Sequence, residues 1–203
     1  MSGRMVFRDD DLSPIELLNL WLTRKALLKS VRHLPQNISV LELGSGYHAR
    51  NLKAIEDRAE QLVAIDFNLS EKLKKNSKFH CIESSIEEAL TSLKDNTFDL
   101  ILVLSVLEHL ENPLQVLKAC HNALKKGGIL MVLVPNWVAK RVLEFLAFKL
   151  EISQVTKDSI NDHKMYYGKR DLWPLLIKAG FVPSSVSLNY KKFGFVVFAH
   201  CIK

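Results

Sequence analysis

Two runs of almost uninterrupted apolar residues constrain the fold of this 203-residue chain more than any other feature. They are FDLILVL at 98–104 and ILMVLV at 129–134. A strand with one face in water alternates apolar and polar residues, whereas a strand covered on both faces does not. The two runs therefore predict buried strands of a parallel sheet with helices packed on both sides.

The rest of the chain supplies the other elements of such a fold. Strand-like segments lie at 38–43, 61–65, 79–82, 182–190 and 193–200, and helical patterns at about 13–33, 49–59, 86–93, 113–124, 137–150 and 170–179. The last two strands are joined by a tight connection that favours an antiparallel hairpin. We expect an α/β fold with a Rossmann-like, doubly wound, seven-stranded sheet, mostly parallel with an antiparallel last strand and with helices on both faces.

Length and pattern indicate one domain over 1–203, with an N-terminal helix within 12–34 and a helical insert at 136–169. The charge balance, 28 basic against 22 acidic residues, gives +6 without a block of five or six like charges. Such a diffuse excess does not indicate a nucleic-acid partner. Because Cys81, Cys120 and Cys201 form no CxxC pair, we expect free thiols and no metal site. With no apolar signal core and no run of eighteen apolar residues, we expect a cytoplasmic protein without a membrane span.

Polar and small residues follow the first two strands where a ligand would bind. In doubly wound sheets, ligands bind outside the carboxyl ends of the strands. Gly44 and Gly46 would let the backbone turn sharply and approach a ligand closely. Asp66 lies twenty residues after Gly46 at the end of the next strand, where an acid can bond ribose hydroxyls. A plain turn and a helix cap would explain each feature alone, but the pair indicates an adenosine-type ligand.

Two cofactor classes share this arrangement. Gly44, Gly46 and Ala49 match the G-x-G-x-x-A pattern of nicotinamide enzymes. Glu42, however, precedes the glycines by two residues, and a carboxylate there would repel a pyrophosphate but attract an ammonium or sulfonium group. A Tyr-x-x-x-Lys pair is also missing, because Tyr167 is followed four residues later by Asp171. The sequence therefore favours a sulfonium cofactor, with a nicotinamide oxidoreductase as the less favoured alternative.

Taken together, several stretches resemble the class I S-adenosylmethionine-dependent methyltransferases, in particular the small-molecule branch typified by ubiquinone-biosynthesis enzymes. The matching stretches are LELGSG at 41–46, AIDFN at 64–68, FDLILVLSVLEHLENP at 98–113, LKKGGILMVLVPN at 124–136 and LWPLLIKAGF at 172–181. The resemblance covers about residues 38 to 200, and the EHL segment after the FDL strand is its most specific part.

The resemblance implies S-adenosylmethionine as cofactor and a role for each matching residue. Glu42 would orient the methionine amino end, and the backbone of Gly44, Ser45 and Gly46 would pass under the methionine and ribose. Asp66 would bind the ribose hydroxyls and Phe67 would pack on the adenine. The adenine amino group would meet Ser85, or in a shifted register Ser84 or Glu83. The methionine side would be lined by Leu104 and Ser105.

Two positions depart from the family pattern. The usual third glycine of the loop is His48, which must keep right-handed backbone angles or tolerate a positive φ. The usual aspartate after the third strand is Ser85. These changes leave open a second alternative, a catalytically weak or inactive methyltransferase-like binding protein.

The resemblance also implies where a methyl acceptor would bind. Related enzymes often carry a histidine and aromatics in the segment before the last helix, and His163, Tyr166 and Tyr167 lie there. We expect His163, or alternatively His109, to act as base or acceptor ligand, with residues 136–169 forming a lid. The apolar helix at 137–150 is compatible with burial, self-association or peripheral membrane contact. Since LSVLEH replaces the D/N-P-P-Y/F motif of base-modifying enzymes, the expected acceptor is a small molecule, sugar or lipid precursor.

Overall fold

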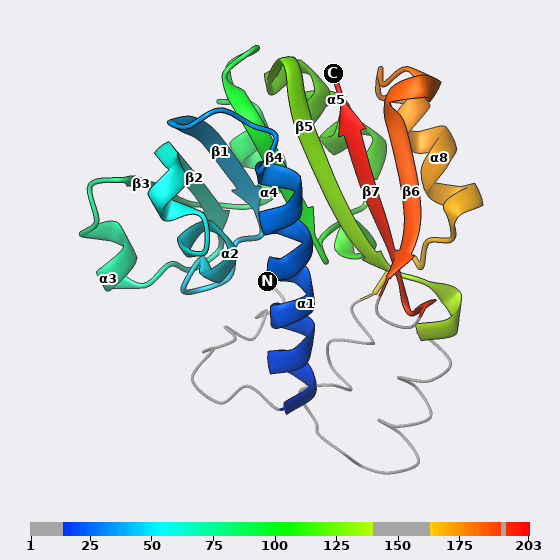
Figure 1. Ribbon diagram of the computed structural model, residues 1–203, viewed down its shortest axis with the longest axis horizontal. Coiled ribbons are helices and arrows are strands. Elements are labelled where there is room, and N and C mark those ends of the chain that lie inside the picture. The colour runs from blue at the N-terminus through cyan, green and yellow to red at the C-terminus, as the bar shows by residue number, and fades with distance from the viewer. Residues whose placement is uncertain (1–13, 140–162, 192–193) are drawn as a thin grey trace.

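The computed structural model describes residues 14–139, 163–191 and 194–203 of the chain. A seven-stranded sheet forms its centre, with the order β3-β2-β1-β4-β5-β7-β6 visible from left to right in Figure 1. The strands are β1 (Ile38–Leu43), β2 (Ala59–Asp66), β3 (Phe79–Glu83), β4 (Phe98–Leu104), β5 (Leu124–Pro135), β6 (Val186–Lys191) and β7 (Val196–Ile202).

The strand directions confirm the predicted fold class. β1 to β5 pair in parallel, and β7 is antiparallel to both of its neighbours, β5 and β6. Strand order reverses between β1 and β4, because β2 and β3 follow on one side and β5 on the other. Crevices at such a reversal are where doubly wound sheets bind ligands, at the carboxyl ends of the strands.

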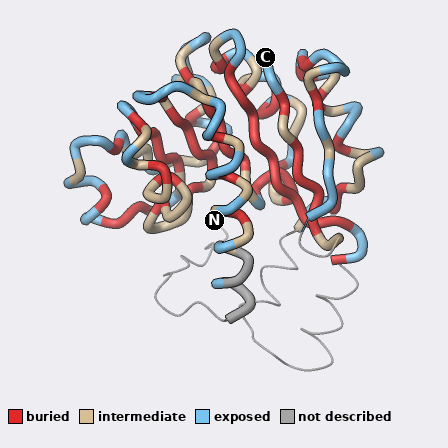
Figure 2. The backbone as a smooth tube through the Cα atoms, in the orientation of Figure 1, coloured by how far each residue is buried: buried red, intermediate tan, exposed pale blue. Residues whose placement is uncertain are grey.

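Each face of the sheet carries its own apolar cluster, which explains why the central strands are apolar throughout. Val40, Leu100 and Leu102 pack with Leu27 and Val31 of α1 (Pro14–Val31) on one face. The alternate residues of the same strands pack on the other face against α5 (Pro113–Ala123) and α8 (Lys169–Lys178). Figure 1 shows α1 in front of the sheet and α5 behind it, and Figure 2 shows the strands between them buried.

The prediction of a helix over residues 49–59 was wrong in the length of that helix. α2 covers only Arg50–Lys53, and the chain then forms a 3-10 turn at Glu56–Arg58 before β2. Leu52 and Ile55 are both buried, and the Arg58 guanidinium donates to the Leu34 carbonyl at 2.8 Å.

β1 and β4 have the predicted ends, and several other elements have shifted ends. α4 covers Ile86–Leu90, β5 begins five residues earlier than predicted, and β6 begins four residues later, after a 3-10 turn at Pro183–Ser185. A short helix, α3 (Glu71–Lys74), was not predicted. It begins at Ser70, whose hydroxyl accepts the Leu73 N–H.

Only the start of the predicted helix at 137–150 can be compared with the structure. Residues 137–139 are helical, and the buried Asn136 accepts the Val138 and Ala139 N–H groups there. The remainder, and with it most of the expected lid and of the segment considered for membrane contact, lies outside the described residues. Within the described part of the chain, each helix is too short or too polar to cross a membrane.

Candidate cofactor and active site

The glycine turn after β1 is held between the ends of two neighbouring strands. The N–H groups of Gly44 and Ser45 donate to the Ile65 carbonyl at 2.8 and 3.1 Å. Gly44 has φ +67°, and a Cβ atom there would lie 2.5 Å from Cγ2 of Val106, which follows β4. Gly46 has a similar φ of +72°, with open space around its missing Cβ. The turn therefore requires glycine for conformation at both positions and for space at Gly44.

Asp66 lies at the end of β2 and faces this turn. Its Oδ2 accepts the Gly46 N–H and its Oδ1 accepts the Phe67 N–H, both at 2.8 Å. Each carboxylate oxygen can accept more than one hydrogen bond, so both retain capacity for a ligand hydroxyl. The Phe67 side chain next to it is 52% exposed. The two cofactor-binding residues expected at this strand end thus stand beside the glycine turn.

The loop after the glycines accommodates the missing third glycine one residue later than expected. The residue with a positive φ is Ala49, at +44°, and not His48. Ala49 is fully buried and directly precedes α2. The small side chain of Ala49 lets this left-handed residue be buried completely, although its Cβ atom makes the conformation costly. The substitution of the third glycine therefore leaves the turn intact, and α2 starts immediately behind it.

Glu42 is a buried carboxyl group at this turn. It is 1% exposed, and its Oε1 accepts the Asn51 Nδ2–H at 2.8 Å. Its Oε2 is buried without a hydrogen-bond partner among the described residues. Burial, and to a smaller extent the nearby charge of Asp66, raise the pKa of Glu42 to about 8, although the Asn51 amide and Leu52 backbone oppose the shift. A cationic ligand beside this group would lower its pKa again and favour the ionised form.

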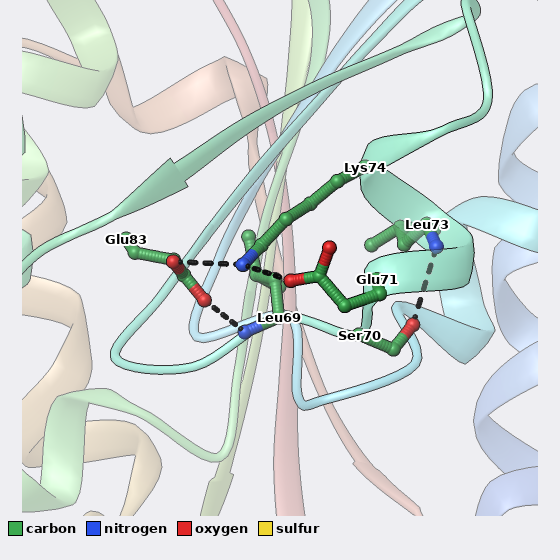
Figure 3. Close-up of polar contacts among 6 residues, drawn as sticks. All are labelled: Leu69, Ser70, Glu71, Leu73, Lys74 and Glu83. Carbon is green, nitrogen blue, oxygen red and sulfur yellow. Dashed lines mark hydrogen bonds and ion pairs between the residues drawn. The ribbon is translucent and has the colours of Figure 1, made fainter.

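The residues expected at the adenine side also form hydrogen bonds within the protein. Ser85 is the N-cap of α4 and forms a capping box with Glu88, so its hydroxyl accepts the Glu88 N–H at 3.2 Å. The Ser84 hydroxyl donates to the Ser85 carbonyl. Glu83 accepts the Leu69 N–H at 2.8 Å and pairs with Lys74 at 3.0 Å (Figure 3).

The Glu83 contacts join the end of β3 to the loop that follows Asp66. The Leu69 N–H, followed by Lys74, lowers the pKa of Glu83 and keeps it ionised. Glu83 is therefore committed to holding the loop together, and the two serine hydroxyls stand at the same strand end. The serines remain the candidates for contact with an adenine amino group.

The end of β4 closes the other side of the turn. Leu104 is half-buried, and Ser105 is exposed with a positive φ of +57° while its N–H donates to the Leu133 carbonyl. The chain then enters a 3-10 turn at Leu107–His109. The segment that contacts Gly44 through Val106 is therefore continuous with the one that carries His109.

The two histidines considered as alternative bases lie next to each other. The rings of His109 and His163 have centroids 4.8 Å apart, and Nδ1 of His163 lies 2.9 Å from the Tyr166 hydroxyl. The Glu108 carbonyl accepts the N–H groups of Lys164 and Met165. Residues 54 positions apart in the sequence thus form one cluster at the end of β4. Tyr166 and Tyr167 are buried, so both also contribute to packing.

Sequence reasoning missed the side chain of Glu108. It is 1% exposed, its Oε2 has no hydrogen-bond partner among the described residues, and burial raises its pKa to about 8. Within the described residues, Glu108, His109 and His163 form one group that could hold a metal ion, with donor atoms within 4.8 Å of one another. Around zinc, with bonds of about 2 Å, ligand atoms lie only about 3.3 Å apart, so the group would have to contract.

Comparison with known proteins agrees with this geometry. Residues 41–132 match the family model described as a methyltransferase domain. A ubiquinone biosynthesis O-methyltransferase of Xanthomonas campestris is 31% identical over 105 residues, which cover 48% of this chain and 43% of that protein. A probable S-adenosylmethionine-dependent methyltransferase of Mycobacterium tuberculosis is 24% identical over 83% of this chain and 58% of its own length.

The fold is also similar to that of a solved methyltransferase structure. The crystal structure of a SAM-dependent methyltransferase from Archaeoglobus fulgidus superimposes with a TM-score of 0.67 at 16% identity, covering 91% of this chain and 94% of that one. Residues 41–132 are thus similar in sequence to a methyltransferase domain, and the fold is that of class I S-adenosylmethionine-dependent methyltransferases. It spans less than half the length of the Xanthomonas relative.

The family's cofactor, S-adenosylmethionine, fits the residues present. Its methionine part carries an ammonium and a sulfonium charge, which suit the buried Oε2 of Glu42. Its ribose hydroxyls suit the remaining acceptor capacity of Asp66. The open space at Gly46 leaves room for close approach to the backbone. A methyltransferase cofactor therefore meets complementary charge at one end of the turn and hydrogen-bond acceptors at the other.

Replacing Gly44 by Ala is expected to destabilise the protein and to weaken cofactor binding, because the added Cβ would collide with Val106. Gly46→Ala is the matched control, since its φ is similar and its Cβ position is open. Both substitutions introduce a conformational strain of order 1 kcal/mol, because both positions have a positive φ. Only Gly44→Ala adds the collision with Val106, so the difference between the two free energies of unfolding, measured in urea, reports that collision. Equal losses of stability in the two variants would contradict the proposed contact.

The pKa of Glu42 predicts a pH-dependent stability. In the ligand-free fold the carboxyl keeps its proton up to about pH 8, whereas the unfolded chain loses it near its ordinary value of 4.5. The folded state therefore binds more protons between these limits, so this group lowers stability as pH rises through them. Glu42→Gln should be more stable than wild type at pH 8 and gain much less at pH 5, as measured by urea unfolding. Glu87→Gln, at an exposed position, is the control and should show no such pH trend.

Proposed function

We propose that this chain is an S-adenosylmethionine-dependent methyltransferase that acts on a small-molecule, sugar or lipid-precursor acceptor. The observation that supports it best is the combination of the glycine turn, the buried Glu42 and Asp66 at the point where strand order reverses. The O-methyltransferase relative is named for ubiquinone biosynthesis, which agrees with a small acceptor.

The cofactor, when bound, supplies an electrophilic methyl group on a sulfonium. Glu42 would hold the amino end of the methionine, Asp66 the ribose, and Phe67 would pack on the adenine, with Ser84 or Ser85 meeting its amino group. The backbone of 44–46 and residues Leu104 and Ser105 would line the methionine side. These residues would act mainly by positioning, which is the chief source of rate in an in-line displacement.

The histidine cluster would serve the acceptor. If Nδ1 of His163 donates its hydrogen to the Tyr166 oxygen, the other ring nitrogen carries the lone pair that a base needs. His163 would then take the proton from an acceptor hydroxyl, and His109, whose ring lies beside it at an interplanar angle of 54°, would support its position. This arrangement favours an oxygen acceptor, for which a base helps most.

The cofactor assignment is tested by calorimetric titration of the purified protein with S-adenosylmethionine, S-adenosylhomocysteine and NAD. We expect the first two to bind and NAD not to bind. Asp66→Asn should weaken both interactions by roughly 1.5–3 kcal/mol, because charged hydrogen bonds to the ribose are lost. Asp95→Asn, at an exposed site away from the strand ends, should leave both affinities unchanged. Binding of NAD alone would support the oxidoreductase alternative.

The acceptor role of His163 is tested by transfer of a labelled methyl group to a panel of small hydroxylated molecules. With any acceptor so found, His163→Ala should lower kcat by roughly 10²–10⁴-fold, the contribution of a positioned base, while cofactor affinity stays unchanged. His80→Ala, on β3 away from this cluster, is the matched control. Undiminished turnover in His163→Ala would assign the base elsewhere. Cofactor binding without any transfer would favour the non-catalytic alternative.

A further inference from the structure

Asn51 is the polar side chain that contacts the buried carboxyl group of Glu42. Its Nδ2 donates to Oε1 at 2.8 Å, and its own Oδ1 is buried without a hydrogen-bond partner among the described residues. The contact joins the first turn of α2 to the last residues of β1 across nine positions of sequence. Asn51 therefore supplies the side-chain hydrogen bond to the buried Glu42 carboxyl group, beside the Leu52 backbone contact.

The position of Asn51 follows from the altered glycine loop. Ala49 takes the left-handed conformation at +44°, and α2 begins at the next residue. This start places Asn51 in the first turn of the helix, above the end of β1.

The contact leaves one carboxylate oxygen of Glu42 available. With Oε1 bound by the Asn51 amide, Oε2 is the oxygen that is buried and without a partner. Without the amide, the carboxyl group would keep only the Leu52 backbone contact, so the direction of its oxygens would be less well defined. An amide N–H directed at Oε1 also favours the ionised form, which is the form that attracts a cation.

We propose that Asn51 is a positioning residue that fixes the Glu42 carboxylate for the aminoalkyl end of the cofactor, and so sets affinity for that part of the ligand. This inference rests on the proposed function, because it requires a ligand with a methionine end at the glycine turn. It assigns to Asn51 no contact with the ligand itself. Its effect is therefore expected only through Glu42 and only for ligands that carry the amino acid part.

Two ligands separate this effect from a general loss of the site. S-adenosylhomocysteine carries the amino acid part, whereas 5′-methylthioadenosine shares the adenosine and lacks it. Asn51→Leu keeps the side-chain size and removes the amide. It should weaken S-adenosylhomocysteine binding by about tenfold, the effect of one hydrogen bond to a charged group, and leave 5′-methylthioadenosine binding unchanged.

The chain offers a matched control for this substitution. Asn76 donates its Nδ2–H to Oε1 of Glu56 at 2.9 Å, an Asn–Glu pair of the same geometry away from the strand ends. Asn76→Leu should leave both affinities unchanged. Asn51→Ser provides a second variant of smaller volume should the leucine disturb folding, and thermal melts of each variant establish that it is folded at the titration temperature.

A double-mutant cycle with Glu42→Gln distinguishes positioning from a merely structural role. If Asn51 acts through the carboxylate, Asn51→Leu should have little further effect on S-adenosylhomocysteine affinity once Glu42 is a glutamine. Additive losses in the double variant, or equal weakening of both ligands by Asn51→Leu, would overturn the inference. Wild-type protein that binds neither ligand would overturn the proposed function instead.

Discussion

Burial of the central sheet on both faces is the constraint on which the rest of the structure depends. Because β1, β4 and β5 are covered by apolar clusters on either side, their side chains cannot carry polar chemistry along their length. An unpaired polar group in such a place would cost free energy. Polar function is therefore confined to the strand ends, and the reversal of strand order between β1 and β4 marks the edge at which sheets of this kind bind ligands.

Glu42 is an exception to the confinement of polar groups to exposed strand ends. It belongs to β1 and is as buried as the apolar residues around it, yet it carries a carboxyl group with one oxygen unmatched. Burying such a group lowers the stability of the empty protein. Buried carboxyl groups with strongly shifted pKa values cluster at functional sites, so Glu42, like Glu108, is informative about function.

Much of this site could be predicted from sequence because its determinants are local. Gly44, Gly46 and Asp66 lie at or just after the ends of apolar strands, and runs of apolar residues in the sequence identify those strands. Asn51 and Glu108 could not be predicted in the same way. The role of Asn51 depends on the residue at which α2 begins, and element ends are the least certain part of a sequence-based prediction. Glu108 reads as an ordinary polar residue until the segment at 163–167 is packed against it.

The same reasoning explains why the departures from the family pattern are less damaging than they look in sequence. A histidine in place of the third glycine suggests a strained loop, but the left-handed residue is Ala49 and the turn keeps both of its bonds to Ile65. A serine in place of the usual aspartate suggests a lost adenine contact, but Ser85 also caps α4. In both cases the backbone, which binds most of a nucleotide-like ligand at such turns, is preserved while side chains vary. Loss of a family side chain is thus weaker evidence against binding than loss of the backbone conformation would be.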